Sequence, residues 1–324
     1  MTGNIAKICE WIRENDDIAV FTHIRPDGDA YGTALALVLA LRALGKRVFP
    51  ACDDAVEEMY RFLPGSGGFV NGDNFPFEPK AVLCADIADR KRMGKLEVWF
   101  DKAQSTAVID HHGTNPGFAH VNAIDASAAA AGEIALDVIR MLGVEITSEI
   151  AENLYVAIST DTGNFSFSST SPETYKKAAE CVACGVNVEN TTRRLYRTRS
   201  LAKTRLLGSA LDNIEMYAGG SIAAIRLTRD MYEKAGAVQA DSQSIVNYLN
   251  EIENVKIGIL ADEIPGGVKF SFRAAGGANV ASLAGVFGGG GHVAAAGASV
   301  FGVKMDEIFE KVIREAEKQV TETV

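Results

Sequence analysis

Two clusters of aspartate and histidine stand out in this chain of 324 residues. The first is His-Ile-Arg-Pro-Asp-Gly-Asp at positions 23–29, and the second is Asp-His-His at positions 110–112. Carboxylate and imidazole groups without thiolates bind divalent cations such as Mn²⁺ and Mg²⁺, and imidazole shifts the preference toward Mn²⁺. The clusters therefore predict two halves of one metal site.

Each cluster directly follows a short run of apolar and β-branched residues. The runs Ile18–Thr22 and Thr106–Ile109 are bounded by turn-forming residues, so we predict two strands that are buried on both faces. Helical patterns follow each cluster. In proteins that alternate strands and helices, ligands bind beyond the carboxyl ends of the parallel strands. We therefore expect the two clusters to meet, although they are far apart along the chain.

Two further aspartates follow the same pattern. A third predicted strand, Ala81–Ala85, delivers Asp86, and a helix that begins near residue 148 leads into Asp161. Each residue also has a simpler explanation: Asp86 could cap a helix, Asp161 could cap a loop, Asp27 could form a turn, and His23 could be a core histidine. Because all of them fall at the ends of strands or helices, a metal site is favoured over these alternatives.

The length and pattern of the chain predict two domains. Residues 1–190 alternate strand and helix, which is typical of α/β folds with a parallel sheet and helices on both faces. Residues 191–213 are predicted to be a helical linker. Residues 214–324 form a smaller mixed α/β pattern, with strands near 221–226, 255–262 and 268–273 and helices near 241–250 and 279–286.

Composition limits the partners of this protein. The formal net charge of −10 disfavours long duplex nucleic acid, because neutralisation of phosphates dominates that affinity. The longest apolar stretch, Ala34–Leu41, is far shorter than the roughly 20 residues that span a membrane. Five scattered cysteines are not the framework of a secreted domain. We expect a cytoplasmic protein with a small substrate and no membrane partner; the oligomeric state stays open, with a homodimer among the alternatives.

The second domain carries a candidate anion site. Four consecutive glycines, 288–291, precede His292, and Arg273 ends a predicted strand. Glycines let backbone N–H groups approach an anion closely, and arginine suits bidentate recognition of phosphate. A flexible turn is the alternative explanation of the glycine run.

Taken in order, these motifs resemble the DHH phosphoesterase family with a C-terminal DHHA1 domain. The segments 23–29, 110–112 and 160–163, together with Asp86, correspond to its four motifs, and 288–292 corresponds to the glycine-rich motif of the DHHA1 domain. The resemblance covers nearly the whole chain. Within the family, length and layout are most similar to the NrnA-type nanoRNases, which also dephosphorylate 3′-phosphoadenosine 5′-phosphate.

The resemblance implies a two-domain fold, with a parallel-sheet DHH domain and a smaller mixed α/β DHHA1 domain across a cleft. It also implies two divalent cations, with Mn²⁺ preferred and Mg²⁺ or Co²⁺ as alternatives. One cation would be bound by His23 and Asp27. The other would be bound by Asp29, His111 and Asp161, and Asp86 would bridge the two.

Further roles follow from the same resemblance. His112 would stand beside the substrate, as a phosphate ligand or a general acid. Asp110 would orient a ligand histidine, because such a histidine usually donates its second N–H to a carboxylate or carbonyl. The substrate phosphate would be held in the second domain by Arg273, Gly289, Gly290, Gly291 and His292.

The implied activity is hydrolysis of short single-stranded oligonucleotides, such as pApA, to mononucleotides, together with removal of phosphate from 3′-phosphoadenosine 5′-phosphate. Three alternatives stay open: a cyclic-dinucleotide phosphodiesterase, an inorganic pyrophosphatase or polyphosphatase, and a nucleotide-binding module without catalysis. The glycine-rich motif counts against the pyrophosphatase, and the intact set of ligand residues counts against a module without catalysis.

Overall fold

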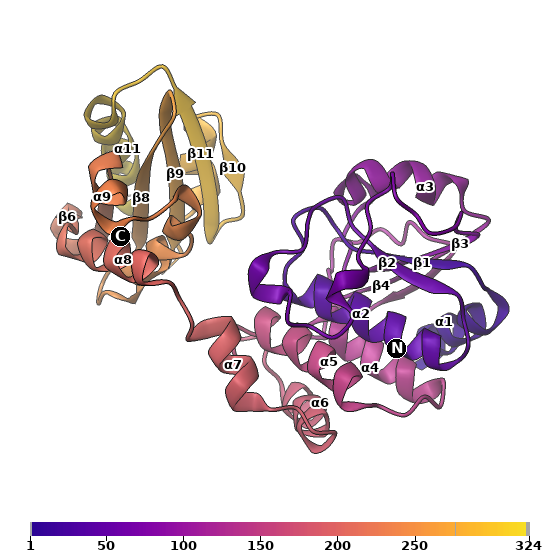
Figure 1. The fold of residues 1–324 in the computed structure, drawn as a ribbon. Coiled ribbons are helices and arrows are strands. Elements are labelled where there is room, and N and C mark those ends of the chain that lie inside the picture. Colours follow the sequence, from indigo (N-terminus) through magenta and orange to yellow (C-terminus); the bar gives the residue numbers. More distant parts are fainter. Residues whose placement is uncertain (1, 276, 322–324) are drawn as a thin grey trace. The chain divides into compact units, whose positions relative to one another are not determined.

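The structure is a computed structural model that describes residues 2–275 and 277–321. These residues fall into two compact units, unit 1 within 1–198 and unit 2 within 199–324 (Figure 1). Residues 191–213, the predicted linker, contain the end of helix α7 and the whole of helix α8.

Unit 1 is built on a parallel sheet. Among the described residues it has five strands in the order β2-β1-β3-β4-β5, and every neighbouring pair is parallel. The strands are β1 (Ile18–Phe21), β2 (Val48–Ala51), β3 (Ala81–Ala85), β4 (Ser105–Asp110) and β5 (Val121–Ile124). The expected parallel sheet is confirmed. We did not predict β5, and only one of its four residues is buried.

Helices cover both faces of this sheet (Figure 1). One face packs against α1 (Thr2–Glu14), α2 (Gly28–Ala43), α4 (Ala131–Met141) and α5 (Ser148–Asp161). The other packs against the 3₁₀ helix η3 (Arg90–Leu96) and α3 (Glu97–Lys102). The remaining helices of unit 1 are η1 (Glu58–Tyr60), η2 (Ser66–Gly68), α6 (Pro172–Ala183) and α7 (Val188–Tyr196).

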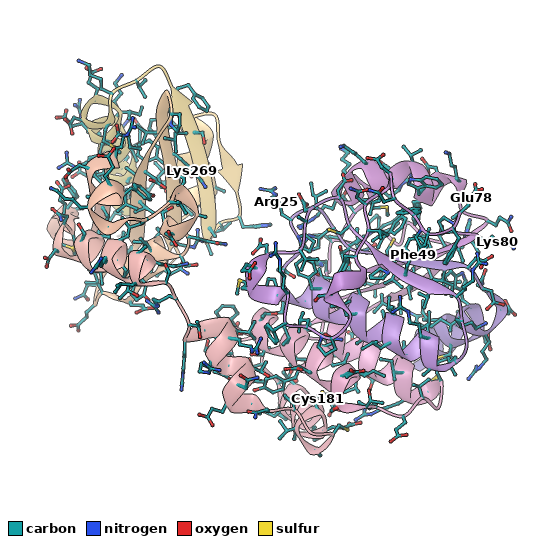
Figure 2. All side chains as sticks on the ribbon, viewed as in Figure 1. Arg25, Phe49, Glu78, Lys80, Cys181 and Lys269 are labelled. Atoms are coloured by element: carbon teal, nitrogen blue, oxygen red, sulfur yellow. The ribbon has the colours of Figure 1, made fainter. Side chains whose placement is uncertain are left out.

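Apolar side chains fill the space between these layers. Helix α2 is buried along almost its whole length, because it is rich in alanine and leucine and lies against both the sheet and α5. Phe49 and Cys181 lie inside unit 1, whereas Arg25, Glu78 and Lys80 are exposed (Figure 2). This packing fixes the carboxyl ends of β1, β3 and β4, where the clusters begin.

Unit 2 is built on a mixed sheet, as expected. In the part of unit 2 that the structure describes, six strands run in the order β10-β11-β9-β8-β7-β6; β7 and β8 are parallel and the other pairs are antiparallel. The strands are β6 (Glu215–Tyr217), β7 (Ile222–Leu227), β8 (Ile257–Ile264), β9 (Gly267–Ala274), β10 (Gly290–Gly291) and β11 (Ala295–Phe301).

Both faces of this second sheet are also covered. One packs against α10 (Val280–Val286) and α11 (Met305–Thr321). The other packs against α8 (Leu201–Asp212), α9 (Arg229–Ala235) and the 3₁₀ helix η6 (Ile245–Glu251). Short 3₁₀ turns η4 (Ala218–Gly220) and η5 (Gln239–Ser242) complete the unit. Nowhere in 2–275 or 277–321 does a helix have the length and apolar character needed to cross a membrane.

Candidate metal centre and phosphate site

The first cluster follows β1 and turns into α2. His23 is only 3% exposed. Asp27 caps α2, because its Oδ1 accepts hydrogen bonds from the backbone N–H groups of Asp29 and Ala30, both at 3.1 Å. Its Oδ2 lies 3.9 Å from Nε2 of His23. One oxygen of Asp27 therefore serves the helix, and the other faces the cluster.

Asp29 is fully buried and is fixed by hydrogen bonds. Its Oδ2 accepts from the backbone N–H of Ala131 at 2.6 Å, and its Oδ1 accepts from the N–H of Gly132 at 3.0 Å and the hydroxyl of Thr33 at 2.8 Å. These N–H groups begin α4, whose N-cap residue Ala130 has no polar side chain. Asp29 thus caps the N-terminus of α4, although it belongs to a different helix, α2. This role fixes the direction of its carboxylate.

Asp86 stands at the centre of the cluster, directly after β3. It is 2% exposed and has a left-handed φ of 58°, which a non-glycine residue rarely adopts. Its Oδ2 lies 3.4 Å from Nε2 of His23, and its Oδ1 lies 3.6 Å from Nε2 of His111. Oδ1 has no hydrogen-bond partner among the described residues. A buried carboxylate oxygen without a partner is costly unless a cation satisfies it.

His111 joins the second cluster to the first. Its Nε2 lies 3.2 Å from Oδ2 of Asp161 and 3.8 Å from Oδ2 of Asp29. Its Nδ1 lies 3.3 Å from the carbonyl oxygen of Ala128. If Nδ1 carries the proton toward that carbonyl, Nε2 is left to offer its lone pair toward the carboxylates, as in a metal-binding histidine.

His112 is held by Asp110. Nδ1 of His112 lies 2.7 Å from Oδ1 of Asp110, and Nδ2 of Asn115 donates to Oδ2 of Asp110 at 2.7 Å. The hydrogen bond to Asp110 raises the pKa of His112. Burial acts to raise the pKa of Asp110, but the hydrogen bonds from His112 and Asn115 outweigh it and the pKa is lowered. We expected Asp110 to orient a ligand histidine, but its partner is His112 and not His111.

Three groups within the described part of the chain are spaced to hold a cation, because the ligand atoms in each lie within 4.8 Å of one another. Asp86 belongs to two of them. The groups are His23 with Asp27 and Asp86; Asp29 with His111 and Asp161; and Asp86 with His111 and His112.

Electrostatics supports a cation at this centre. Burial, together with repulsion from neighbouring carboxylates, raises the pKa of both Asp29 and Asp86 well above the ordinary value. Burial also raises the pKa of Asp161. Carboxylates this close become compatible with ionisation when a cation lies between them. The donor set of carboxylates and imidazoles, with an unsatisfied oxygen on Asp86, fits divalent cations.

Sequence reasoning missed the residues that support this centre. Thr33 lies one helical turn after Asp29, which is a readable signal for a hydrogen bond on one helix face. Asn115 and Arg92 had no such signal. Arg92 belongs to η3, and its Nη2 lies 2.8 Å from Nδ1 of His23.

Strand register relates two residues of the candidate anion site in unit 2, Arg273 and His292. Arg273 of β9 lies opposite Ala295 of β11, and the backbone N–H of His292 donates to the carbonyl of Ala295 at 2.8 Å. Ala295 therefore lies between Arg273 of β9 and His292, which directly follows β10. Arg273 also donates from Nε to Oδ1 of Asn247 at 3.0 Å.

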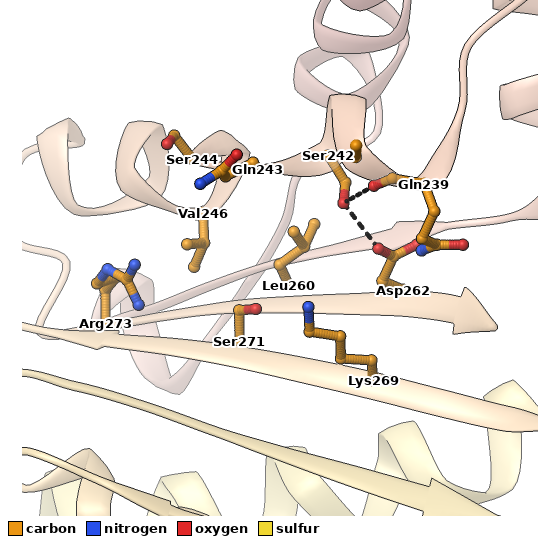
Figure 3. A pocket seen from close by; sticks show the side chains of 11 residues that line it. Gln239, Ser242, Gln243, Ser244, Val246, Leu260, Asp262, Lys269, Ser271 and Arg273 are labelled. Carbon is orange, nitrogen blue, oxygen red and sulfur yellow. Dashed lines mark hydrogen bonds between the residues drawn. The ribbon is translucent and has the colours of Figure 1, made fainter. Parts of the chain in front are cut away.

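A cavity of about 270 Å³ lies on the same face of β9 as Arg273. Lys269, Ser271 and Arg273 alternate along the strand and line it (Figure 3). At its far end Asp262 accepts a hydrogen bond from the hydroxyl of Ser242 at 2.9 Å. We did not predict Lys269. Its spacing of four residues from Arg273 along a strand places the two side chains on the same face, so the sequence could have indicated it.

Two of the glycines are required by close packing. A Cβ on Gly289 would lie 2.1 Å from the carbonyl oxygen of Gly297, and a Cβ on Gly291 would lie 2.6 Å from that of Ala295. Gly291 also has a φ of 148°, which favours glycine. Around Gly290 the described chain has no atom within 4 Å of such a Cβ, so close packing does not explain this glycine.

Comparisons with known proteins agree with this architecture. The model of the N-terminal domain of the DHH family matches residues 17–158, and that of the DHHA1 domain matches residues 219–320. The bifunctional oligoribonuclease and PAP phosphatase NrnA of Thermus thermophilus is 37% identical over 306 residues, which cover 94% of this chain and 90% of the relative. This chain belongs to the DHH phosphoesterase family.

A further relative and two solved structures extend the match. The protein of the same name from Bacillus subtilis is 27% identical, over 88% of this chain and 90% of its own. The structure of an exopolyphosphatase-related protein from Bacteroides fragilis has a TM-score of 0.90 at 26% identity and covers 98% of this chain and 97% of its own. Exonuclease RecJ bound to manganese shares the fold, with a TM-score of 0.59 at 14% identity, over 99% of this chain and 97% of its own. The expected class of enzyme, a metal-dependent phosphoesterase, is confirmed by the family.

Proposed function

We propose that this protein hydrolyses short single-stranded oligonucleotides, including pApA-type dinucleotides, to mononucleotides, and removes phosphate from 3′-phosphoadenosine 5′-phosphate. The observation that carries the proposal is the position of Asp86, whose two oxygens face His23 on one side and His111 on the other. One carboxylate shared by two cation groups is the arrangement that two-metal phosphoesterases need. The names of the relatives, bifunctional oligoribonucleases and PAP phosphatases, supply the substrate class.

Two of the three groups support the ligand set that the family resemblance implies. His23 and Asp27 hold one cation, with Mn²⁺ preferred because imidazole takes part. The second cation would be held by Asp29, His111 and Asp161. Asp86 would be shared, because its Oδ1 lies 3.6 Å from Nε2 of His111. When bound, such a pair of cations lowers the pKa of water to give a nucleophile and stabilises charge on the phosphoryl centre. The chain itself fixes the carboxylates, through the helix caps that Asp27 and Asp29 form.

His112 supplies the proton for the leaving oxygen. Its Nδ1 is bound to Asp110, so Nε2 is the nitrogen left to face the substrate. Because Asp110 raises the pKa of His112, more of the imidazole carries a proton on Nε2 near neutral pH. A protonated imidazole at this position is suited to general acid catalysis.

Unit 2 binds a phosphate of the substrate. Arg273 supplies a planar pair of N–H donors, and the imidazole of His292 supplies a donor from the neighbouring hairpin. Lys269 adds a second positive charge on the same face of the sheet. The register that places Ala295 between Arg273 and His292 supports this assignment.

The test is a substrate profile with Mn²⁺. The protein is incubated with pApA, a pentanucleotide, a long single-stranded RNA, a cyclic dinucleotide, 3′-phosphoadenosine 5′-phosphate and pyrophosphate. We expect fast release of mononucleotides from pApA and slow degradation of the long RNA. Equal rates on all lengths, or no hydrolysis of any, would refute the proposal. Pyrophosphate is included because one structure of high similarity is named as exopolyphosphatase-related.

A further inference from the structure

Arg92 places a positive charge beside the metal centre. Its Nη2 lies 2.8 Å from Nδ1 of His23, and the side chain is half-buried.

The backbone around Arg92 is fixed on several sides. Its carbonyl oxygen accepts a hydrogen bond from the N–H of Ile24 at 2.7 Å, which ties η3 to the first cluster. Met93 is fully buried, and the N–H of Lys95 donates to Oδ2 of Asp53 at 2.7 Å. Gly94 adopts a left-handed φ of 60° here, where a Cβ would lie 2.6 Å from Asp53 and from Ile24. The guanidinium thus projects from a rigid turn, as preorganised binding of an anion requires.

Arg92 has no carboxylate partner of its own in the described part of the chain. Arg90, two residues earlier, differs in this respect: its guanidinium pairs with Glu97 and Asp101 and lies 5.2 Å from the ring centroid of Phe100. The same short helix therefore carries one arginine with carboxylate partners and one without.

The contact with His23 does not use the charge of Arg92. Nε2 of His23 faces the carboxylates of Asp27 and Asp86, so Nδ1 carries the proton when Nε2 offers a lone pair. That proton points to the carbonyl of Ile24, which lies 2.9 Å from Nδ1. In this tautomer an N–H of Arg92 meets a second donor and has no acceptor on His23.

We infer that Arg92 is a further catalytic residue, whose guanidinium donates hydrogen bonds to two non-bridging oxygens of the substrate phosphate at the metal centre. Arginine suits this role because its fixed fork matches two phosphate oxygens. The inference rests on the proposed function for the identity of the substrate. The binding of a phosphate beside His23 does not depend on which phosphoester is hydrolysed.

The competing explanation is that Arg92 only positions His23. In that case its loss would weaken cation binding first, and phosphate binding only as a consequence. A residue that contacts phosphate would leave the affinity for the cation alone unchanged. The two explanations therefore differ in a measurement that needs no turnover.

The experiment compares the wild type with R92Q, R92K and the matched control R90Q. R90Q removes the same charge from the same helix. Titration calorimetry first measures the affinity of each protein for Mn²⁺ alone, and then the affinity of the Mn²⁺-loaded protein for inorganic phosphate. Steady-state hydrolysis of pApA gives KM and kcat separately, and thermal unfolding checks that each variant is folded.

We expect R92Q to weaken phosphate binding about tenfold or more, because a charge-assisted pair of hydrogen bonds is lost, with R92K intermediate. The affinity for Mn²⁺ should stay within about twofold of the wild type, and R90Q should match the wild type in both titrations. In turnover, R92Q should lower kcat/KM for pApA by at least the same factor.

Several results would overturn the inference. The inference fails if R92Q and R92K bind phosphate as tightly as R90Q does. It also fails if R92Q loses affinity for Mn²⁺ by the same factor as its affinity for phosphate, because Arg92 would then be a positioning residue. If the wild type does not hydrolyse pApA but phosphate affinity still depends on Arg92, the proposed function fails and the inference stands. If the wild type hydrolyses pApA and R92Q is unaffected, the inference fails and the function stands.

Discussion

At the residue scale, the carboxylates of the metal centre oppose the stability of the metal-free protein. Asp29 and Asp86 are buried beside one another and beside Asp161, and burial is the first cause of their raised pKa values. In the folded state the protonated form of each is therefore favoured. At neutral pH their ionisation costs stability, and bound cations offset this cost.

Replacing Asp86 with Asn should therefore stabilise the metal-free protein. A raised pKa in the folded state means that this residue destabilises the fold increasingly as pH rises above about 4, the unfolded value. D86N removes that effect and should raise the melting temperature in EDTA by a few degrees, at about 2 to 4 °C per kcal/mol for a protein of this size. The rise in melting temperature on adding Mn²⁺ should be lost.

The control for this measurement is D73N, which changes an exposed carboxylate outside the cluster. It should leave both melting temperatures unchanged. A D86N protein that is less stable than the wild type in EDTA would contradict the destabilising effect of the Asp86 charge. A D86N protein that keeps the full response to Mn²⁺ would show that Asp86 does not hold a cation.

Replacing Asp110 with Asn should change the pH dependence of turnover. The hydrogen bond to Asp110 raises the pKa of His112, so the protonated acid persists to a higher pH in the wild type. Activity should fall as pH rises through that pKa, and D110N should move this fall to lower pH because the raising effect is reduced. The measurement is the pH profile of kcat for pApA; an unchanged profile would exclude His112 as the acid.

Much of the centre was predictable at this scale, but its support was not. His23, Asp86 and His111 fall at the ends of predictable strands, and the resemblance to the DHH family assigned each of them a role as a cation ligand. The sequence did not say which histidine Asp110 contacts, although alternation along an extended chain places Asp110 and His112 on one side and His111 on the other. Arg92 was missed because no periodicity marks a side chain that reaches the centre from a 3₁₀ turn.

At the scale of elements, the spacing of α2 and α5 sets the geometry of the centre. Asp29 lies at the start of α2 and Asp161 at the end of α5. The helices approach so closely that a Cβ on Gly32 would lie 2.3 Å from the backbone oxygen of Asn153. Because that obstacle is backbone, a larger residue must push the helices apart.

The substitution G32A should therefore destabilise the protein by about 1 to 3 kcal/mol, the usual cost of overpacking. It should also weaken Mn²⁺ binding, because Asp29 moves relative to Asp161. Urea unfolding and titration calorimetry measure the two effects. The matched control is G208A in α8, where the described chain leaves open space; it should stabilise by about 0.4 to 1 kcal/mol. Equal effects of the two substitutions would contradict the role of the α2–α5 contact.

Long apolar elements were predictable and short or small-residue elements were not. The strands β1, β3 and β4 carry continuous apolar runs and are fully or almost fully buried. β11 was not predicted, because its alanines and glycine carry little apolar signal although the strand pairs along its whole length with β9. The helix expected near 241–250 is the 3₁₀ helix η6, a distinction that periodicity over so few residues does not make.

At the scale of the whole molecule, the two units have separate sheets, separate cores and separate proposed tasks. If unit 2 binds a phosphate and unit 1 holds the cations, R273Q should raise KM for pApA about tenfold or more without changing the response of the melting temperature to Mn²⁺. The control is R229Q, which removes an exposed arginine of unit 2 that pairs with Glu233. An R273Q protein with unchanged KM, or with weaker Mn²⁺ binding, would contradict this division of tasks.

The central claim is that Asp86 belongs to a metal centre that hydrolyses short phosphodiesters. Its most direct test is the rate at which AMP is released from pApA in Mn²⁺, measured side by side for the wild type and D86N. The account predicts rapid release by the wild type and a loss of at least about a hundredfold in D86N, because a shared metal ligand is removed. No release by the wild type, or release by D86N at the wild-type rate, would contradict it.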